Sequence, residues 1–214
     1  MIRKFLEMFW NKNNNEENTT EATVFEEIEE MFNSLDDNGV KVLLGEDLER
    51  FTDELGNEIK NLRSDIKQEC GFILPPINIK PDNCLQENEY KITVNGKVVF
   101  YDFIIPTKEH TIKEVISGLN NSFHENIADY FTNEITERYA CIVQKNNNWL
   151  AWNVTGSISI TSLKTILIDL IKNKQPINNI IDIFERINEE IYSNSTPAWI
   201  RDPHDISKKI LQTF

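Results

Sequence analysis

The sequence predicts an α/β (α+β) protein with a small mixed sheet, hairpins and packed helices, followed by a C-terminal helical subdomain. Short β-type runs occur between residues 40 and 105, and apolar residues recur at helical spacing from residue 157 to the end. Between them, Asn95-Gly96 is flanked by alternating apolar residues, which is typical of a two-residue hairpin. The 214 residues are enough for one large domain or two small ones.

Residues 1–10, MIRKFLEMFW, are expected to form a short amphipathic segment, and residues 11–22 a polar, flexible linker. The segment has no small-residue cleavage pattern after it, so it does not resemble a signal peptide. Peripheral contact with a membrane surface, binding to a neighbouring protein, and packing on its own domain remain open alternatives. The longest apolar runs are shorter than the roughly 20 residues that span a bilayer, and we expect no transmembrane segment.

Residues 23–156 are predicted to form the α/β domain. A capping box of Thr23 and Glu26 starts one helix, and residues 40–44 are a predicted strand. The next helix begins near Thr52 and ends at Gly71. It carries one apolar stripe that should face a sheet, formed by Leu55, Ile59, Leu62 and Ile66.

Two hairpins are expected in the rest of this domain. Pro75-Pro76 cannot donate ladder hydrogen bonds, so the strand through Ile77 and Ile79 should begin after them or lie at a sheet edge. Residues 90–94 and 98–105 form the hairpin around Asn95-Gly96. A long helix is then predicted from Thr111 to about residue 136, and a second hairpin is predicted from residues 139–144 and 149–154.

Residues 157–214 are predicted to form a helical subdomain. Pro176 marks one helix start, and Asp202 or Pro203 opens the last helix. The apolar residues that should face inward are Leu163, Ile166, Leu167, Leu170, Ile171, Ile177, Ile180, Ile181, Phe184, Ile187, Ile191, Ile206, Ile210 and Leu211.

The charge balance argues against a nucleic-acid partner. The formal net charge is −13, and the sequence contains no run of Lys and Arg that would neutralise a phosphate backbone. A solvated acidic surface explains this charge most simply, with attraction of a basic partner as the alternative. The sequence has three cysteines, Cys70, Cys84 and Cys141. Their odd number and the absence of Cys-x-x-Cys spacing fit a protein of the reducing cytosol without a disulfide framework.

No combination of residues predicts catalysis. His110, His124 and His204 are dispersed, without a second ligand at metal-site spacing. The polar residues around His204 are those that a helix start requires. The sequence has no Gly-x-Ser-x-Gly elbow, Walker loop or dinucleotide fingerprint. We therefore expect no catalytic residue, no metal and no cofactor, and a protein that is not an enzyme.

The tryptophans near predicted turns leave two interpretations open. Trp149, Trp152 and Trp199 are either binding anchors or residues that close the core.

A series of short motifs between Leu62 and Tyr90 carries the most specific information. In order, it contains Gly71-Phe72, Pro75-Pro76, Ile77-Asn78-Ile79-Lys80, Asp82-Asn83 and Asn88-Glu89-Tyr90-Lys91-Ile92. This series resembles the cytoplasmic domain of the FHIPEP family, the FlhA-type export-gate component of flagellar and virulence type III secretion systems. Residues 42–45, 159–167, 176–185 and 201–203 are also similar to that family, so the resemblance covers roughly residues 40–105 and 157–212.

The sequence also departs from the family pattern. The several-helix membrane portion of the family has no counterpart here. Ile177-Asn178-Asn179-Ile180 lacks the Arg and Asp that the family carries, and residues 108–153 look shortened and altered.

The resemblance implies a cytoplasmic, partner-binding protein. In the family, this domain assembles into a ring and docks export chaperones that carry substrates, using a cleft near the Gly-Phe strand start. By position, Glu69 and Phe72 would border that cleft; their simpler roles are a solvated carboxylate and a core phenylalanine. The implied partners are export chaperones, substrates or secretion components, with a homo-oligomer also implied. The alternative is a repurposed regulatory or scaffold protein of the same fold that acts outside secretion.

Overall fold

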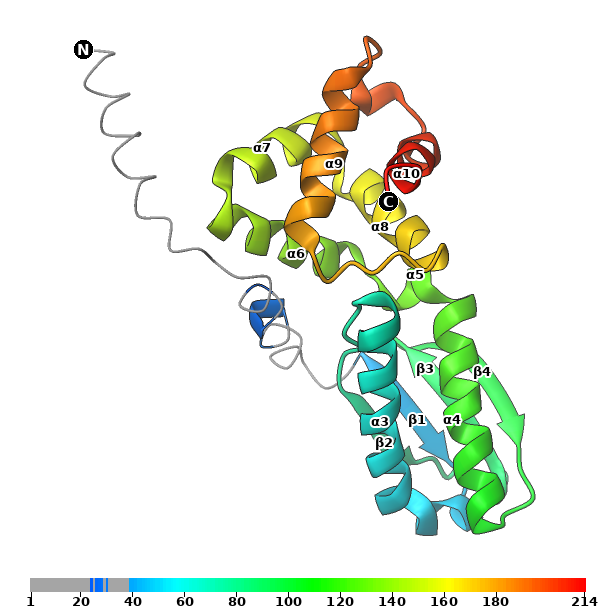
Figure 1. Ribbon diagram of the computed structural model, residues 1–214. Helices are drawn as coiled ribbons and strands as arrows, with labels where there is room; N and C mark the ends of the chain where they lie inside the picture. The colour runs from blue at the N-terminus through cyan, green and yellow to red at the C-terminus, as the bar shows by residue number, and fades with distance from the viewer. Residues whose placement is uncertain (1–23, 25, 29, 31–38) are drawn as a thin grey trace.

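The structure is a computed structural model that describes residues 24, 26–28, 30 and 39–214, and it consists of an α/β body and a helical body (Figure 1). The sheet has the strand order β2-β1-β3-β4. Its strands are β1 (Val40–Leu44), β2 (Ile77–Pro81), β3 (Glu89–Val94) and β4 (Lys97–Phe103). β1 pairs with β2 in parallel and with β3 antiparallel, so the sheet is mixed. The predicted fold class is confirmed.

The first predicted hairpin is also confirmed. Asn95 and Gly96 join β3 to β4 with φ values of 51° and 80°, the two positive values that a type I′ turn requires. β2 begins directly after Pro75-Pro76 and lies at a sheet edge, as the missing N–H groups predict.

Helices α3 (Thr52–Cys70) and α4 (Lys108–Glu125) cover one face of the sheet (Figure 1). The 3₁₀ helix η2 (Glu46–Phe51) leads into α3. Gly71 ends α3 in the left-handed conformation, with φ of 68°, and its N–H donates to the Lys67 carbonyl. The predicted apolar stripe of α3 is buried at Leu55, Ile59, Leu62 and Ile66.

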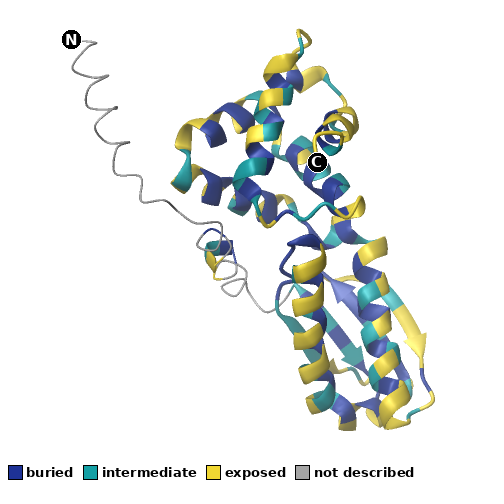
Figure 2. Ribbon diagram, in the orientation of Figure 1, coloured by how far each residue is buried: buried dark blue, intermediate teal, exposed yellow. Residues whose placement is uncertain are grey.

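The helical body begins after α4. It contains α5 (Ile127–Tyr130), α6 (Asn133–Asn146), α7 (Asn148–Ser157), α8 (Ile160–Lys172), α9 (Ile180–Ser193), η3 (Ala198–Ile200) and α10 (Pro203–Leu211). α7 packs against α6 and α9, and α8 packs against α6 and α10. Figure 2 shows the inner sides of these helices buried and their outer sides exposed. The division of domains at residue 156 stays a prediction.

The second predicted hairpin is wrong. Residues 139–144 belong to α6, and residues 149–154 belong to α7. The Asn147 side chain accepts a hydrogen bond from the Leu150 N–H, so the asparagine run caps a helix instead of forming a strand turn. β-propensity gave a false signal here because packing on other helices decides the local structure.

The predicted long helix from residue 111 to 136 is divided into three helices. α4 ends at Glu125, α5 covers one turn, and α6 begins after Thr132. The Thr132 hydroxyl accepts a hydrogen bond from the Ile135 N–H and starts a new helix. The apolar periodicity continues across both breaks, which is why the sequence suggested one helix.

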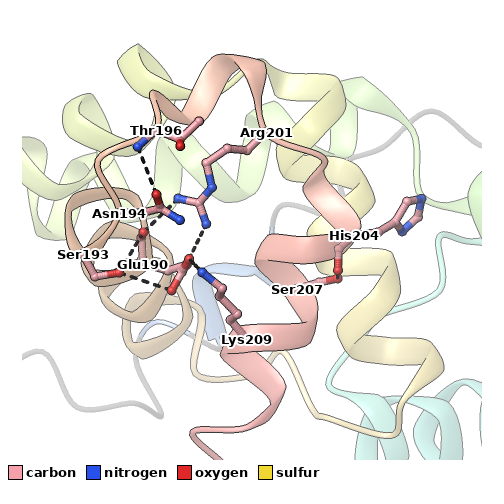
Figure 3. A network of polar contacts seen from close by, with 8 residues as sticks. All are labelled: Glu190, Ser193, Asn194, Thr196, Arg201, His204, Ser207 and Lys209. Atoms are coloured by element: carbon pink, nitrogen blue, oxygen red, sulfur yellow. Dashed lines mark hydrogen bonds and ion pairs between the residues drawn. The ribbon is translucent and has the colours of Figure 1, made fainter.

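A partly buried ion-pair network holds the C-terminal helices together (Figure 3). The Glu190 carboxylate of α9 accepts from the Arg201 guanidinium and from Lys209 Nζ, the latter at 3.0 Å. Arg201 also donates to the Glu190 carbonyl at 3.0 Å. The side chains of Glu190 and Arg201 are 13% and 8% exposed. One carboxylate thus joins α9, the segment after η3 and α10, and we call these three residues the Glu190 clamp.

The predicted helix start near His204 is confirmed. The Asp202 carboxylate accepts a hydrogen bond from the His204 N–H and caps α10, with Pro203 in the first turn. The His204 ring lies 2.6 Å from Asp169 of α8 and therefore also ties α10 to α8.

The predicted segments 1–10 and 11–22 lie outside the described residues. Of the helix predicted from Thr23, the described residues are helical, and Val24 and Ile28 are buried. Of the described helices, none by itself has the length and apolar character to cross a membrane. α7 and α8 meet that criterion only as a pair, and the chain bends by 104° between them.

Candidate functional site

A groove of about 920 Å³ runs between α3 and α4 on the outer side of the α/β body. We call it the acidic groove. On α3 it is lined by Glu54, Asn57, Glu58, Leu62, Asp65 and Glu69; on α4 it is lined by Lys108, Glu109, Ile112, Lys113, Ile116, Ser117 and Asn120.

The charges of the groove do not balance. Five acidic side chains line it against two lysines. Lys108 Nζ lies 2.6 Å from the Glu54 carboxylate, and its hydrogen bond holds the pKa of that carboxyl below its usual range. Within the described part of the chain, no ion pair involves Asp65 or Glu69. The excess negative charge therefore lies toward the Glu69 end.

The floor of the groove is apolar. Leu62 is buried, and Ile112 and Ile116 are half-buried against the core. Figure 1 shows α3 and α4 side by side over the sheet. Glu54 near the start of α3 meets Lys108 at the start of α4, and Glu69 lines a second cavity together with His124 near the other end. The two helices therefore run in the same direction, with apolar side chains between two polar walls.

The two residues that were expected to border a docking cleft, Glu69 and Phe72, differ in their exposure. Glu69 is exposed and lines the acidic groove and the neighbouring cavity of about 350 Å³. Phe72 has no exposed surface and packs between Phe123 and Phe131, with ring centroids at 5.6 and 5.2 Å. Phe72 is thus a core residue at the junction of the two bodies, and a docking role for either residue remains a prediction.

The tryptophans and cysteines that the sequence singled out do not line the acidic groove. Trp149, Trp152 and Trp199 are 66%, 70% and 73% exposed, so they do not close the core. Cys84 and Cys141 are exposed, whereas Cys70 is buried, and burial raises the pKa of its thiol to about 11. Among the described residues, no group of three or more His, Cys, Asp or Glu side chains is placed to hold a metal ion.

The family resemblance places Glu69 beside a docking cleft, and the sequence does not predict the acidic groove between α3 and α4. The sequence predicts the helix that carries Ile112 and Ile116, but no contact between that helix and Glu69. The carboxylates of α3 at positions 54, 58, 65 and 69 recur at helical spacing, and that signal was available in the sequence. The pairing of α3 with α4 is a tertiary contact that no local pattern specifies.

Comparison with protein families gives one match. The model of the FHIPEP family matches residues 4–118, which is more than half of the chain. A comparison with curated proteins finds no sequence that matches.

Solved structures with the same fold are distant in sequence. The Chlamydia pneumoniae CdsV protein has a TM-score of 0.64 at 15% identity, and the same protein in a complex with CdsO has 0.63 at 14%. A nonameric SctV-C from EPEC has 0.62 at 13% identity. Each match covers 83% of this chain and 65% of the other, so the chain spans less than two thirds of the length of these structures.

Proposed function

The chain belongs to the FHIPEP family, and we propose that it is a non-enzymatic, cytoplasmic protein that binds partner proteins at the acidic groove. The acidic groove supports this proposal. It is large, its floor is apolar, and it ends at Glu69, the residue that the family resemblance places at a docking cleft. A concave site with an apolar floor and polar walls is suited to hold part of another protein.

The partners that the family suggests are export chaperones, their substrates or other components of a secretion apparatus. The complex of CdsV with CdsO supports protein partners for this fold, and the nonameric SctV-C supports self-association. Both remain proposals for this chain.

Glu69 and Phe72 have different roles in this proposal. Glu69 contacts the partner directly, since its carboxylate is exposed at the groove end. Phe72 is buried against Phe123 and Phe131, so it would affect the groove only through the packing of the core. Substitution of Phe72 therefore affects binding through the fold and is a poor test of the groove.

The test is a pull-down of the tagged full-length protein from its native cytosol, with partners identified by mass spectrometry. Ile116→Ser removes apolar floor from the half-buried part of the groove, and Ile181→Ser of α9 is the matched control because Ile181 is also half-buried. We expect Ile116→Ser to lose secretion components that the control retains. If the proteins that Ile116→Ser loses are regulators unrelated to secretion, the scaffold alternative is favoured. If Ile116→Ser and Ile181→Ser capture the same partners equally well, docking at the groove is contradicted.

A further inference from the structure

We propose that the acidic groove takes a basic amphipathic α-helix of the partner protein. This inference rests on the proposed function, namely that the groove binds a protein, and it specifies what the bound segment must look like.

The length of the groove sets the length of the bound segment. The groove follows α3 from Glu54 to Glu69, which corresponds to about 22 Å at 1.5 Å per residue. A bound helix of about four turns fits that distance. It would pack along two parallel helices, as helices do when the side chains of one fill the space between those of others.

The lining favours a helix over an extended peptide. Every residue that lines the groove belongs to α3 or α4. The main-chain groups inside a helix are already paired, so the groove offers no strand edge to which an extended peptide could hydrogen-bond. A helix satisfies its own main chain and needs only a side-chain surface.

The floor and the walls define that surface. Leu62, Ile112 and Ile116 require an apolar stripe at helical spacing on the partner. Asp65 and Glu69 stand beside this floor without an ion pair in the described part of the chain, so Lys or Arg residues should flank the stripe. Because exposed ion pairs are individually weak, the floor should supply most of the affinity, and the walls should exclude acidic helices.

The experiment uses the full-length protein and two labelled synthetic peptides, with fluorescence anisotropy as the readout. One peptide is an amphipathic helix of about four turns with a Leu stripe flanked by Lys, and the other has Glu in place of each Lys. We expect binding of the Lys peptide only, weakened as salt screens the exposed charges.

Two double variants locate the binding. Asp65→Lys with Glu69→Lys reverses the groove wall, and Glu185→Lys with Glu189→Lys makes the same change in net charge on the exposed side of α9. We expect the groove double to weaken binding of the Lys peptide by about tenfold or more, and the α9 double by less than about twofold. Circular dichroism and thermal unfolding check the fold of each variant. Asp65→Asn with Glu69→Gln should give an intermediate loss and replaces the reversed double if that variant does not fold.

Three results would overturn the inference. Equal weakening by both doubles would mean that overall charge alone attracts the peptide. Equal binding of the Glu peptide would remove the need for a basic helix. The third result concerns a native partner that is lost in Ile116→Ser but binds the Asp65→Lys, Glu69→Lys double variant unchanged. That result would support protein binding at the groove and contradict the need for a basic helix.

Discussion

A β-carbon on Gly71 would lie 2.4 Å from the backbone nitrogen of Asn178. The chain after α8 therefore passes directly against the end of α3, and the Ile177 N–H donates to the Cys70 carbonyl at 2.9 Å. This contact joins the helical body to the α/β body next to Glu69. The Glu69 end of the acidic groove therefore lies directly beside the junction between the two bodies.

Gly71→Ala should destabilise the protein by more than about 1–2 kcal/mol. The left-handed conformation alone costs about that much for a residue with a β-carbon, and the contact with Asn178 adds to the cost. The control is Gly56→Ala in the same helix, where a β-carbon meets no atom within 4 Å. That change should raise stability by about 0.5–1 kcal/mol in urea unfolding. Equal changes in the free energy of unfolding for Gly71→Ala and Gly56→Ala would argue against the close approach of Gly71 to the backbone of Asn178.

Phe72→Ala should lower the free energy of unfolding by about 3–5 kcal/mol. Its ring has no exposed surface and contacts Phe123 and Phe131, so the substitution leaves a cavity at the junction. Phe103→Ala is the matched control, because that ring is 68% exposed and should change stability by less than about 0.5 kcal/mol. Full stability of Phe72→Ala together with lost partner binding would instead give Phe72 a direct surface role.

Glu190→Gln should destabilise the C-terminal helices by about 1–3 kcal/mol. The amide removes the negative charge that Arg201 and Lys209 share, and leaves the buried Arg201 guanidinium without its counter-charge. Thermal unfolding followed by circular dichroism measures the loss. Glu189→Gln, at an exposed position of the same helix, should have almost no effect.

The Glu190 clamp should also weaken in acid. Burial by itself would raise the pKa of the Glu190 carboxyl, but the hydrogen bonds from Lys209 and Arg201 outweigh it and hold that pKa below its ordinary value of 4.5. Its contribution to stability is therefore complete above pH 4.5 and is lost as the pH falls through the lowered folded-state pKa. Glu190→Gln should lack this part of the acid dependence. An unchanged acid profile in the variant would contradict the role of the clamp.

The three cysteines should differ in reactivity. Cys84 and Cys141 are exposed, whereas the Cys70 thiol is buried and its pKa is raised to about 11. Because the thiolate is the reactive form, a thiol reagent at neutral pH should modify two cysteines in the native protein and the third only after unfolding. Mass spectrometry of the labelled peptides identifies each site. Fast native labelling of Cys70 would mean that the end of α3 opens readily.

The sequence was informative wherever a local rule determined the structure. Asn95-Gly96 predicted the hairpin turn, Gly71 predicted the end of α3, and Pro75-Pro76 predicted a strand that begins after them or lies at a sheet edge. Local rules failed at residues 139–154, where aromatic and β-branched residues suggested strands although Asn147 caps a helix. The sequence did not predict the acidic groove, because its second wall depends on how α4 packs against α3; Glu69 was named only through the family resemblance.

Site-specific photo-crosslinking in native cytosol tests whether the acidic groove is the surface that binds the partner. A crosslinking residue at Ser117 would lie in the α4 wall of the groove, and one at Glu185 would lie on the exposed side of α9. We predict that the probe at residue 117 captures a discrete partner, and that a tryptic crosslink maps to a basic helical segment of it, while the probe at 185 does not. Capture of the same partner from residue 185 and not from residue 117 would show that the partner does not bind in the acidic groove.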